Sequence, residues 1–260
     1  MNPDWLQPDW AVDGVGGLMS TRAGGQSTPP FDRLNLGSGV GDDPVVVTRN
    51  RAIFRAAAGG AVPVFLKQVH GTRVVRLTAQ HAAADATVEE ADASITSEPG
   101  LACTVLVADC LPALFAAPEG RAVGAAHAGW RGLCGGVLEA TLREVCASGV
   151  CSPEEVSVWL GACIGPRRFE VGSDVLEAFG AADDTAVAAC FAPLRPGKWL
   201  ADLPRLARLR LTAAGVRHIS GGSWCTVEDA SRFFSFRRDG VTGRMAAAVW
   251  IARGGDRRVP

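Results

Sequence analysis

The chain has 260 residues, of which 48% are hydrophobic and 20% charged, and its formal net charge is −1. This composition suffices for a packed core, and the near-neutral charge provides no basic field for nucleic-acid binding. We find neither a signal peptide in residues 1–17 nor an apolar run that could span a bilayer. We therefore expect a cytoplasmic protein, monomeric and without a membrane partner, whose eight cysteines are reduced thiols.

The first half of the chain predicts one helix followed by several strands. Asp43-Pro44 is typical of a helix N-terminus, with a capping acid before a proline at the first helical position, and Gly59-Gly60 ends that helix. Residues 64–77 predict two short strands separated by a turn. The apolar runs at 101–108 and 121–126 predict buried strands.

The second half alternates helices and strands without an even βα rhythm. Its predicted elements are a helix at 133–147, a strand at 156–160, helices at 173–179 and 203–215, and strands at 216–220 and 245–252. This pattern predicts the α+β class, as a single mixed α/β domain over residues 1–260 with a large mixed β-sheet core flanked by helices. Residues 1–17 and 253–260 are expected to be peripheral tails, and two tightly packed subdomains are the alternative.

His70, Cys110 and His127 each follow an apolar run, at the position where a buried strand presents side chains to a ligand. One thiolate and two imidazoles suit Zn²⁺, with a fourth position left for water or substrate. However, a cysteine after a strand is more often a small buried hydrophobe, and no CxxC or HExxH pattern is present. Spacing alone therefore leaves both interpretations open.

Asp109, directly before Cys110, is a candidate general acid or base, and its alternative role is to end a strand. The Gly-containing turn at 127–132 leads into a helix, where the helix N-terminus and Arg131 favour an anion. Segment 233–238 combines aromatic residues with arginine, which would suit a nucleobase and a phosphate, although such a run is usually core. The candidate substrate-binding residues are Arg22, Asn35, Arg73, Arg131 and Arg237, each of which has an ordinary surface position as its alternative.

Two further functions fit the same residues. Cys110 and His127 also fit a nucleophile–base pair, which predicts a Cys/His hydrolase or deamidase but leaves His70 without a role. A non-catalytic metal-binding module would need a fourth protein ligand, for which His81 and His218 are available. The catalytic residues that we expect are Asp109, Cys110 and His127.

Five motifs resemble those of the laccase-domain family, whose members have been named both multicopper polyphenol oxidases and purine nucleoside phosphorylases. They are Gln68-Val69-His70-Gly71, Ala108-Asp109-Cys110-Leu111-Pro112, Ala126-His127-Ala128-Gly129-Trp130-Arg131-Gly132, Gly161-Ala162-Cys163-Ile164-Gly165-Pro166 and Phe233-Phe234-Ser235-Phe236-Arg237-Arg238. Their order agrees with the family, and the resemblance runs from about Thr21 to the last predicted strand. The family often has tyrosine where this chain has Phe236, so any role of a phenolic hydroxyl there is in doubt.

The resemblance implies a cytoplasmic α+β domain in which His70, Cys110 and His127 bind Zn²⁺. It also implies phosphorolysis of adenosine, inosine and methylthioadenosine to the free base and (methylthio)ribose 1-phosphate, with adenosine deaminase as a side activity. A purine nucleoside and phosphate would then be the small-molecule partners. Family members have also been linked to copper-dependent oxidation of phenols and to the removal of wrong residues from peptidoglycan precursors.

The histidine content discriminates among these activities. Four histidines in the whole chain cannot hold the several coppers that laccase chemistry needs. A site of one thiolate and two imidazoles accepts Zn²⁺ readily, and Cu²⁺ would outcompete Zn²⁺ in vitro by the ordinary affinity order. We therefore predict a zinc-dependent purine nucleoside enzyme. The alternatives are a copper-dependent polyphenol oxidase, a Cys/His hydrolase acting on a cell-wall precursor, and a non-catalytic metal-binding module.

Overall fold

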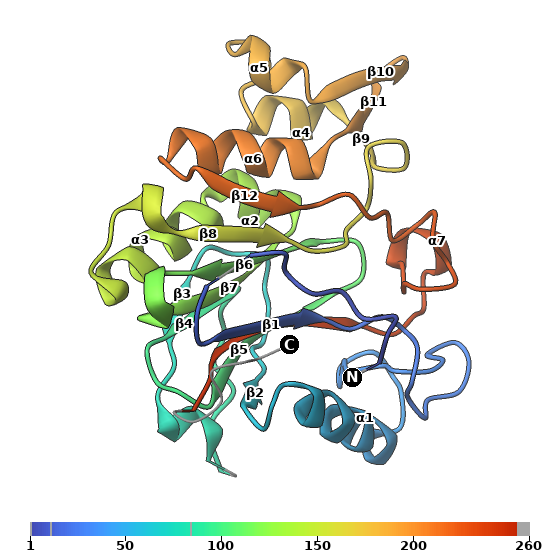
Figure 1. Cartoon of the computed structure of the whole chain (residues 1–260). Helices are drawn as coiled ribbons and strands as arrows, with labels where there is room; N and C mark the ends of the chain where they lie inside the picture. The colour runs from blue at the N-terminus through green and yellow to red at the C-terminus, as the bar shows by residue number, and fades with distance from the viewer. Residues whose placement is uncertain (1, 11, 84, 254–260) are drawn as a thin grey trace.

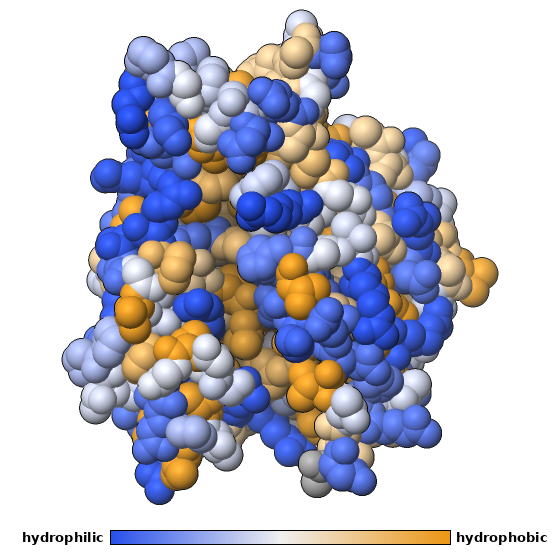
Figure 2. Space-filling view, turned by 180° about the vertical axis from the view of Figure 1, so that it is seen from behind, coloured by the Kyte–Doolittle hydropathy of each residue, from blue (hydrophilic) through white to orange (hydrophobic). Residues whose placement is uncertain are grey.

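A computed structural model of the chain describes residues 2–10, 12–83 and 85–253. Two β-sheets pack face to face at its centre, helices cover their outer faces, and a small third sheet projects at the top of Figure 1. Seen from behind, the surface is hollowed near its middle, where hydrophobic residues lie between hydrophilic ones (Figure 2). Among the described residues, no helix is long and apolar enough to cross a membrane.

The first sheet has four strands in the order β1, β13, β5, β2. They are β1 (Val15–Met19), β13 (Met245–Ile251), β5 (Leu101–Val107) and β2 (Val62–Val64). Strand β13 runs antiparallel to both of its neighbours, whereas β2 runs parallel to β5. The helix α1 (Pro44–Ala57) covers the outer face, where Phe54 is buried against small residues such as Ala246 and Ala248.

The second sheet has six strands in the order β12, β8, β6, β7, β4, β3. They are β12 (His218–Gly221), β8 (Ser157–Leu160), β6 (Leu111–Ala116), β7 (Val123–Ala128), β4 (Ala93–Thr96) and β3 (Val74–Arg76). The helices α3 (Val137–Gly149) and α6 (Leu203–Ala213) contribute apolar side chains to the core on its outer face.

Every residue of β6 and β7 is buried, because one face of these strands meets the first sheet and the other meets helices. Along the strand β5, successive side chains point to opposite faces of the first sheet. Cys103, Val105 and Val107 face the second sheet, whereas Ala102 and Leu106 pack on the side of α1. The core between the sheets thus fixes the register of β6 and β7, whose ends carry two of the residues singled out from the sequence.

The third sheet consists of β10 (Phe191–Arg195), β11 (Lys198–Ala201) and β9 (Glu170–Val171), in that order. The remaining helices are α2 (Trp130–Gly135), α4 (Ser173–Ala178), α5 (Thr185–Ala188) and α7 (Phe236–Asp239), and three short 3-10 turns are η1 (Ala79–Ala82), η2 (Pro118–Gly120) and η3 (Pro153–Glu155).

The mixed α/β class with helix-flanked sheets is confirmed, with two facing sheets at the centre. The helix predicted at 133–147 is two helices, because Gly136 has a left-handed φ of 98° between α2 and α3. The segment 1–17 was expected to be a peripheral tail, but its described part contributes Trp5 and Leu6 to the core and begins β1. Apart from Arg253, the predicted C-terminal tail lies outside the described residues.

Candidate metal centre

His70, Cys110 and His127 converge as the sequence predicted. Their ligand atoms all lie within 4.8 Å of one another. The Sγ of Cys110 is 3.8 Å from Nε2 of His70, and the two imidazole centroids are 4.9 Å apart at an interplanar angle of 74°. His127 is buried, whereas Cys110 is partly exposed and His70 exposed, so the group is open on one side.

Strand pairing explains how two of these residues meet. Cys110 directly precedes β6, and His127 is the penultimate residue of β7. In the antiparallel register Leu111 pairs with Ala128 and Pro112 with His127, so the start of one strand lies beside the end of the other. His70 comes from the loop between β2 and β3 and has a left-handed φ of 62°, which turns that loop toward the strand ends.

The side chain of Gln68 docks the His70 loop on the first sheet. Its amide nitrogen donates to the carbonyl of Leu106 at 2.8 Å, and its amide oxygen accepts the N–H of Leu106 at 2.8 Å. Because one amide side chain satisfies both polar groups of a single β5 residue, the loop is held as if it were a further strand.

A buried carboxylate, that of Asp92, joins the loop to the strand. One oxygen accepts from Nδ1 of His127 at 2.8 Å and from the backbone N–H of His70 at 2.9 Å. The other accepts the N–H groups of Val69 at 3.1 Å and Gly71 at 2.7 Å. With Nδ1 occupied, His127 presents Nε2 to a ligand, which is the arrangement that metal-binding histidines use. Sequence reasoning missed Asp92, whose only signal was an acid at the start of a buried strand.

The charges at this centre stabilise one another. Burial alone raises the pKa of the Cys110 thiol, but attraction to His127 and hydrogen bonds from both imidazoles outweigh burial and lower the pKa to about 6. Burial alone lowers the pKa of His127, but Cys110 and Asp92 together raise it to about 9. The thiolate that a metal requires is therefore available at neutral pH.

The donor set fits a metal ion with an open coordination position. Among residues 2–10, 12–83 and 85–253, no other group of three or more His, Cys, Asp or Glu ligands meets so closely. The two candidates for a fourth ligand lie elsewhere: Nδ1 of His81 is bonded to Thr78, and His218 is on the edge strand β12. One thiolate and two imidazoles without a fourth protein ligand are typical of catalytic Zn²⁺ sites.

The open side of the centre faces a cavity of about 720 Å³. Its walls are formed by Gly37, Ser38, Gly39, Val40, Arg51, Phe65, Leu66, Lys67, Gln68, His70, Val88, Leu106, Val107, Ala108, Cys110, His127, Phe236 and Arg244. Three of these side chains are cationic and none is acidic. Phe236 and Val88, at 58% and 62% relative exposure, are among the most exposed large hydrophobic residues described. The cavity therefore suits a ligand that is both aromatic and anionic.

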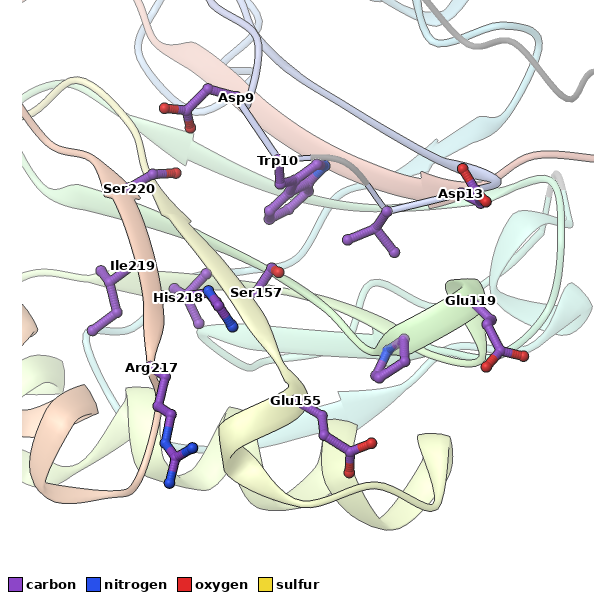
Figure 3. Close-up of a pocket in the computed structure, with 13 residues that line it drawn as sticks. Asp9, Trp10, Asp13, Glu119, Glu155, Ser157, Arg217, His218, Ile219 and Ser220 are labelled. Atoms are coloured by element: carbon purple, nitrogen blue, oxygen red, sulfur yellow. The ribbon is translucent and has the colours of Figure 1, made fainter.

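A second groove, of about 730 Å³, lies between the N-terminal segment and the strands β8 and β12 (Figure 3). Its walls carry Trp10, His218, Arg217 and several carboxylates. Among its lining residues there is no thiol and only one imidazole, so it offers nothing comparable to the centre above.

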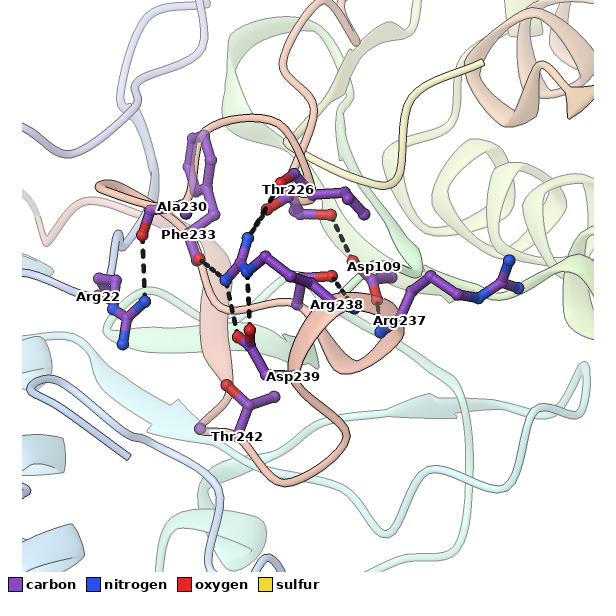
Figure 4. Close-up of polar contacts among 12 residues, drawn as sticks. Arg22, Asp109, Thr226, Ala230, Phe233, Arg237, Arg238, Asp239 and Thr242 are labelled. Carbon is purple, nitrogen blue, oxygen red and sulfur yellow. Dashed lines mark hydrogen bonds and ion pairs between the residues drawn. The ribbon is translucent and has the colours of Figure 1, made fainter. Parts of the chain in front are cut away.

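Asp109, directly before Cys110, is buried, and hydrogen bonds hold both of its carboxylate oxygens (Figure 4). One carboxylate oxygen accepts from Oγ1 of Thr226 at 2.5 Å, and the other accepts the backbone N–H of Arg237 at 2.6 Å. The guanidinium of Arg238 donates to the carbonyls of Thr226 and Phe233, which fixes the same segment. Since both oxygens are engaged, this geometry favours a positioning role, and the acid–base role predicted from the sequence stays a prediction.

None of the five predicted substrate-binding residues lines the metal cavity. Arg22 pairs with Asp32 and donates to the carbonyl of Ala230, in a separate small cavity. Asn35 is fully buried, and its amide holds neighbouring backbone.

The other three arginines are exposed. Arg73 pairs with Glu89 at 2.8 Å. Arg131 stacks on Trp130, with its guanidinium carbon 4.3 Å from the ring centroid. Arg237 donates through its side chain to the carbonyl of Glu170. Substrate binding by these residues stays a prediction.

The cations that do line the cavity are Arg51, Lys67 and Arg244, none of which the sequence singled out. They carried no motif signal, because Arg51 belongs to an ordinary helix and Arg244 precedes an ordinary strand. Only their place in the folded chain brings them to the metal centre.

Comparison with known proteins identifies the family. Residues 17–252 match the family described as multi-copper polyphenol oxidoreductase laccase. The chain belongs to this family. It is 48% identical over 248 residues to the purine nucleoside phosphorylase PA4543 of Pseudomonas aeruginosa, with 95% of this chain and 98% of that protein covered. It is also 48% identical over 250 residues to the purine nucleoside phosphorylase YfiH of Escherichia coli, with 96% and 97% covered.

Solved structures share the fold of this family member. NMB0706 of Neisseria meningitidis, a DUF152 family protein, superimposes with a TM-score of 0.88 at 44% identity, covering 96% of this chain and all of that one. YlmD of Geobacillus stearothermophilus superimposes with a TM-score of 0.89 at 32% identity, with 97% and 98% covered. The multicopper part of the family description does not fit this chain, since only two of its four histidines lie at the centre.

Proposed function

We propose that this protein is a zinc-dependent purine nucleoside phosphorylase that acts on adenosine, inosine and methylthioadenosine in the cytoplasm, with adenosine deamination as a side activity. The observation that carries the proposal is the open three-donor centre facing a cavity with an exposed aromatic ring, cationic walls and no carboxylate. The names of the bacterial relatives as purine nucleoside phosphorylases support it. We expect the protein to act as a monomer.

In phosphorolysis a phosphate oxygen forms a bond to C1′ of the ribose while the bond from C1′ to the base nitrogen breaks. The base leaves with the electron pair and takes up a proton. A bound Zn²⁺ would supply Lewis-acid chemistry at His70, Cys110 and His127. Phe236 offers a ring face on which a purine can stack, and a guanidinium group of the cavity wall can hold phosphate near the ribose.

The assay for this proposal is product analysis. Metal-loaded protein incubated with inosine and phosphate should release hypoxanthine and an equal amount of ribose 1-phosphate, and base release should stop when phosphate is omitted. Adenosine without phosphate should yield inosine if the deaminase activity is present. A verified metal content combined with no base release from any purine nucleoside would rule out the phosphorylase.

The Cys/His hydrolase is the second candidate, and one observation favours it. Asp92 binds Nδ1 of His127, so Cys110, His127 and Asp92 have the connectivity of a nucleophile, a base and an orienting acid. Such an enzyme, acting on a cell-wall precursor, would keep its activity when a chelator removes the metal. The zinc enzyme would lose its activity and regain it with added Zn²⁺.

Copper chemistry is the weakest alternative. Cu²⁺ binds imidazole and thiolate donors more tightly than Zn²⁺, so copper-loaded protein can be prepared in vitro. We propose that any phenol oxidation by such a preparation is slow, because a single three-donor site cannot store the four electrons that reduce O₂ to water.

A further inference from the structure

Three cations and no carboxylate line the metal cavity, where the Cys110 thiolate is the one negative group among the lining residues. Of its three cations, Lys67 is exposed and forms an ion pair with Glu90 at 3.0 Å. Within the described part of the chain, no carboxylate lies within 4.0 Å of the guanidinium of Arg51 or of Arg244. Both arginines are partly buried, and desolvation lowers the pKa of each. For Arg244, desolvation outweighs the attraction of Cys110 and Asp109, and Asp109 forms no ion pair with it. A partly buried guanidinium without a carboxylate in contact favours an anionic ligand.

The two guanidinium groups differ in what they leave free. Arg51 uses Nε and Nη2, the edge that binds an oxyanion in bidentate fashion, on the carbonyl of Leu36 at 3.0 Å and on Oγ of Ser38 at 3.4 Å. One face of Arg51 also covers the ring of Phe65, with a centroid distance of 4.0 Å. Arg51 is therefore committed to holding the cavity wall.

Arg244 has the opposite arrangement. Only its Nη1 is engaged, donating to the carbonyls of Thr242 at 3.0 Å and Gly243 at 3.1 Å. Its Nε and Nη2 have no hydrogen-bond acceptor among the described residues, although the side chain lines the cavity beside Cys110. Nη1 thus anchors the guanidinium, while the Nε and Nη2 edge stays free. These two donors form a pre-organised fork that can bind a tetrahedral oxyanion in bidentate fashion.

The surroundings of Arg244 fix its stem. The buried Asn35 accepts the backbone N–H groups of Arg244 at 2.8 Å and Gly37 at 2.9 Å, and the N–H of Leu36 donates to the carbonyl of Arg244 at 3.0 Å. A Cβ at position 37 would come within 2.7 Å of Cγ of Arg244, so glycine is what lets the stem pass there. In the structure, the side-chain oxygen of Asn35, a predicted substrate ligand, positions Arg244 by accepting its backbone N–H.

We propose that Arg244 is the residue that binds inorganic phosphate, through its Nε and Nη2 edge, at the wall of the metal cavity. The choice of phosphate as the anion rests on the proposed phosphorylase function. The presence of an oxyanion subsite at Arg244 does not, because it follows from the free guanidinium edge, the absence of a carboxylate partner and the position beside Cys110.

The test is calorimetric titration of inorganic phosphate into the zinc-loaded protein. Arg244→Met should weaken phosphate binding by about tenfold or more, and Arg244→Lys, which keeps the charge but not the fork, should weaken it less. The matched control is Lys67→Met, which removes one charge from the same cavity and should change binding by less than about threefold. The contacts of residue 244 with Asn35 and Leu36 are made by its backbone, so zinc content should be unchanged. The lost side-chain hydrogen bonds to Thr242 and Gly243 should lower the thermal unfolding temperature slightly while the protein stays folded.

A second variant leaves every charge in place. Gly37→Ala should displace the Arg244 stem and weaken phosphate binding although no cation is lost. Absence of phosphate binding to the wild type, unchanged binding in Arg244→Met, or equal losses in Arg244→Met and Lys67→Met would each overturn the proposal. Binding of adenosine 5′-monophosphate that depends on Arg244, with no binding of inorganic phosphate, would assign the fork to a phosphate ester and overturn it as well.

The two proposals fail differently. Phosphate binding that depends on Arg244, without base release from any nucleoside, would leave the subsite standing and refute the phosphorylase. Base release whose KM for phosphate is unchanged in Arg244→Met would leave the phosphorylase standing and refute the subsite.

Discussion

The carboxylate of Asp92 lies 2.8 Å from Nδ1 of His127 and, through its two oxygens, also accepts the backbone N–H groups of Val69, His70 and Gly71. One buried acid therefore orients an imidazole on β7 and holds the loop that carries the second imidazole. Because both metal-binding histidines depend on it, Asp92 sets the geometry of the centre without contacting the metal position itself.

Replacing Asp92 by Asn should weaken zinc binding by about 10–100-fold. An amide has one acceptor oxygen, so it cannot serve His127 and three N–H groups, and it removes the charge that favours the Nδ1–H form of His127. Competition for Zn²⁺ with a chromophoric chelator measures the effect. Glu90→Gln is the matched control, because Glu90 is an exposed acid nearby that pairs with Lys67. Equal zinc affinity in Asp92→Asn and wild type would show that the acid has no such role.

Cys110 should be the most reactive thiol of the metal-free protein. The pKa of Cys110 is lowered to about 6, so its thiolate persists down to that pH. Alkylation by iodoacetamide should therefore reach half its maximal rate near pH 6 and become slower at lower pH. Burial raises the pKa of Cys103 to about 12, so Cys103 should stay unmodified in the folded protein. Mass spectrometry of peptides alkylated at several pH values reports both. A midpoint near that of a free thiol would contradict the predicted ion pair, and bound Zn²⁺ should protect Cys110.

Asp109→Asn separates positioning from acid–base catalysis. The asparagine oxygen can accept the N–H of Arg237, and its amide can donate to the hydroxyl of Thr226, so a positioning role should survive with a loss of less than about tenfold in kcat. A general acid or base would lose about 10²–10⁴-fold. Asp109→Ala should be impaired under either role and serves as the reference. A loss of the larger size in Asp109→Asn would therefore return Asp109 to the catalytic role predicted from the sequence.

Phe236→Ala should raise the KM for the nucleoside by about tenfold, since stacking of a base on an aromatic ring is worth about 1–3 kcal/mol. The KM for phosphate should change less than the KM for the nucleoside, because the guanidinium of Arg244 lies 5.9 Å from the ring centroid but is anchored by its own hydrogen bonds. Stability should not change, because the ring is exposed. Phe236→Tyr keeps the ring face and should behave like the wild type. Val241→Ala, an exposed apolar residue outside the cavity, is the control. An unchanged KM for the nucleoside would place the base elsewhere.

The sequence locates the three donors of the metal centre, but it does not single out the cations that line the cavity beside them. His70, Cys110 and His127 each follow an apolar run, and the antiparallel pairing of β6 with β7 brings Cys110 beside His127. The strand β6 itself was not predicted, because Pro112 and the polar pair before it are typical of a loop. Strand ends are local features, so their chemistry can be read from local sequence.

The missing residues depend on contacts between distant segments. Asp92 reaches His127 only because Ala93 on β4 pairs with Ala126 on β7. Arg244 is placed by Asn35, 209 residues away in the chain. Arg22, in contrast, lies in a Gly-containing loop that resembles a binding loop, but Asp32 neutralises its charge. Whether an arginine is free or paired is a property of the folded chain, which motif reasoning does not reveal.

We propose that a metal at His70, Cys110 and His127 drives phosphate-dependent cleavage of purine nucleosides. The most direct test is to titrate Zn²⁺ into metal-free protein and follow the release of hypoxanthine from inosine at saturating phosphate. We predict that the rate rises linearly and levels off at one Zn²⁺ per chain, and that Cys110→Ala shows no such rise. Full activity in the metal-free protein, or activity that added Zn²⁺ does not change, would contradict this account.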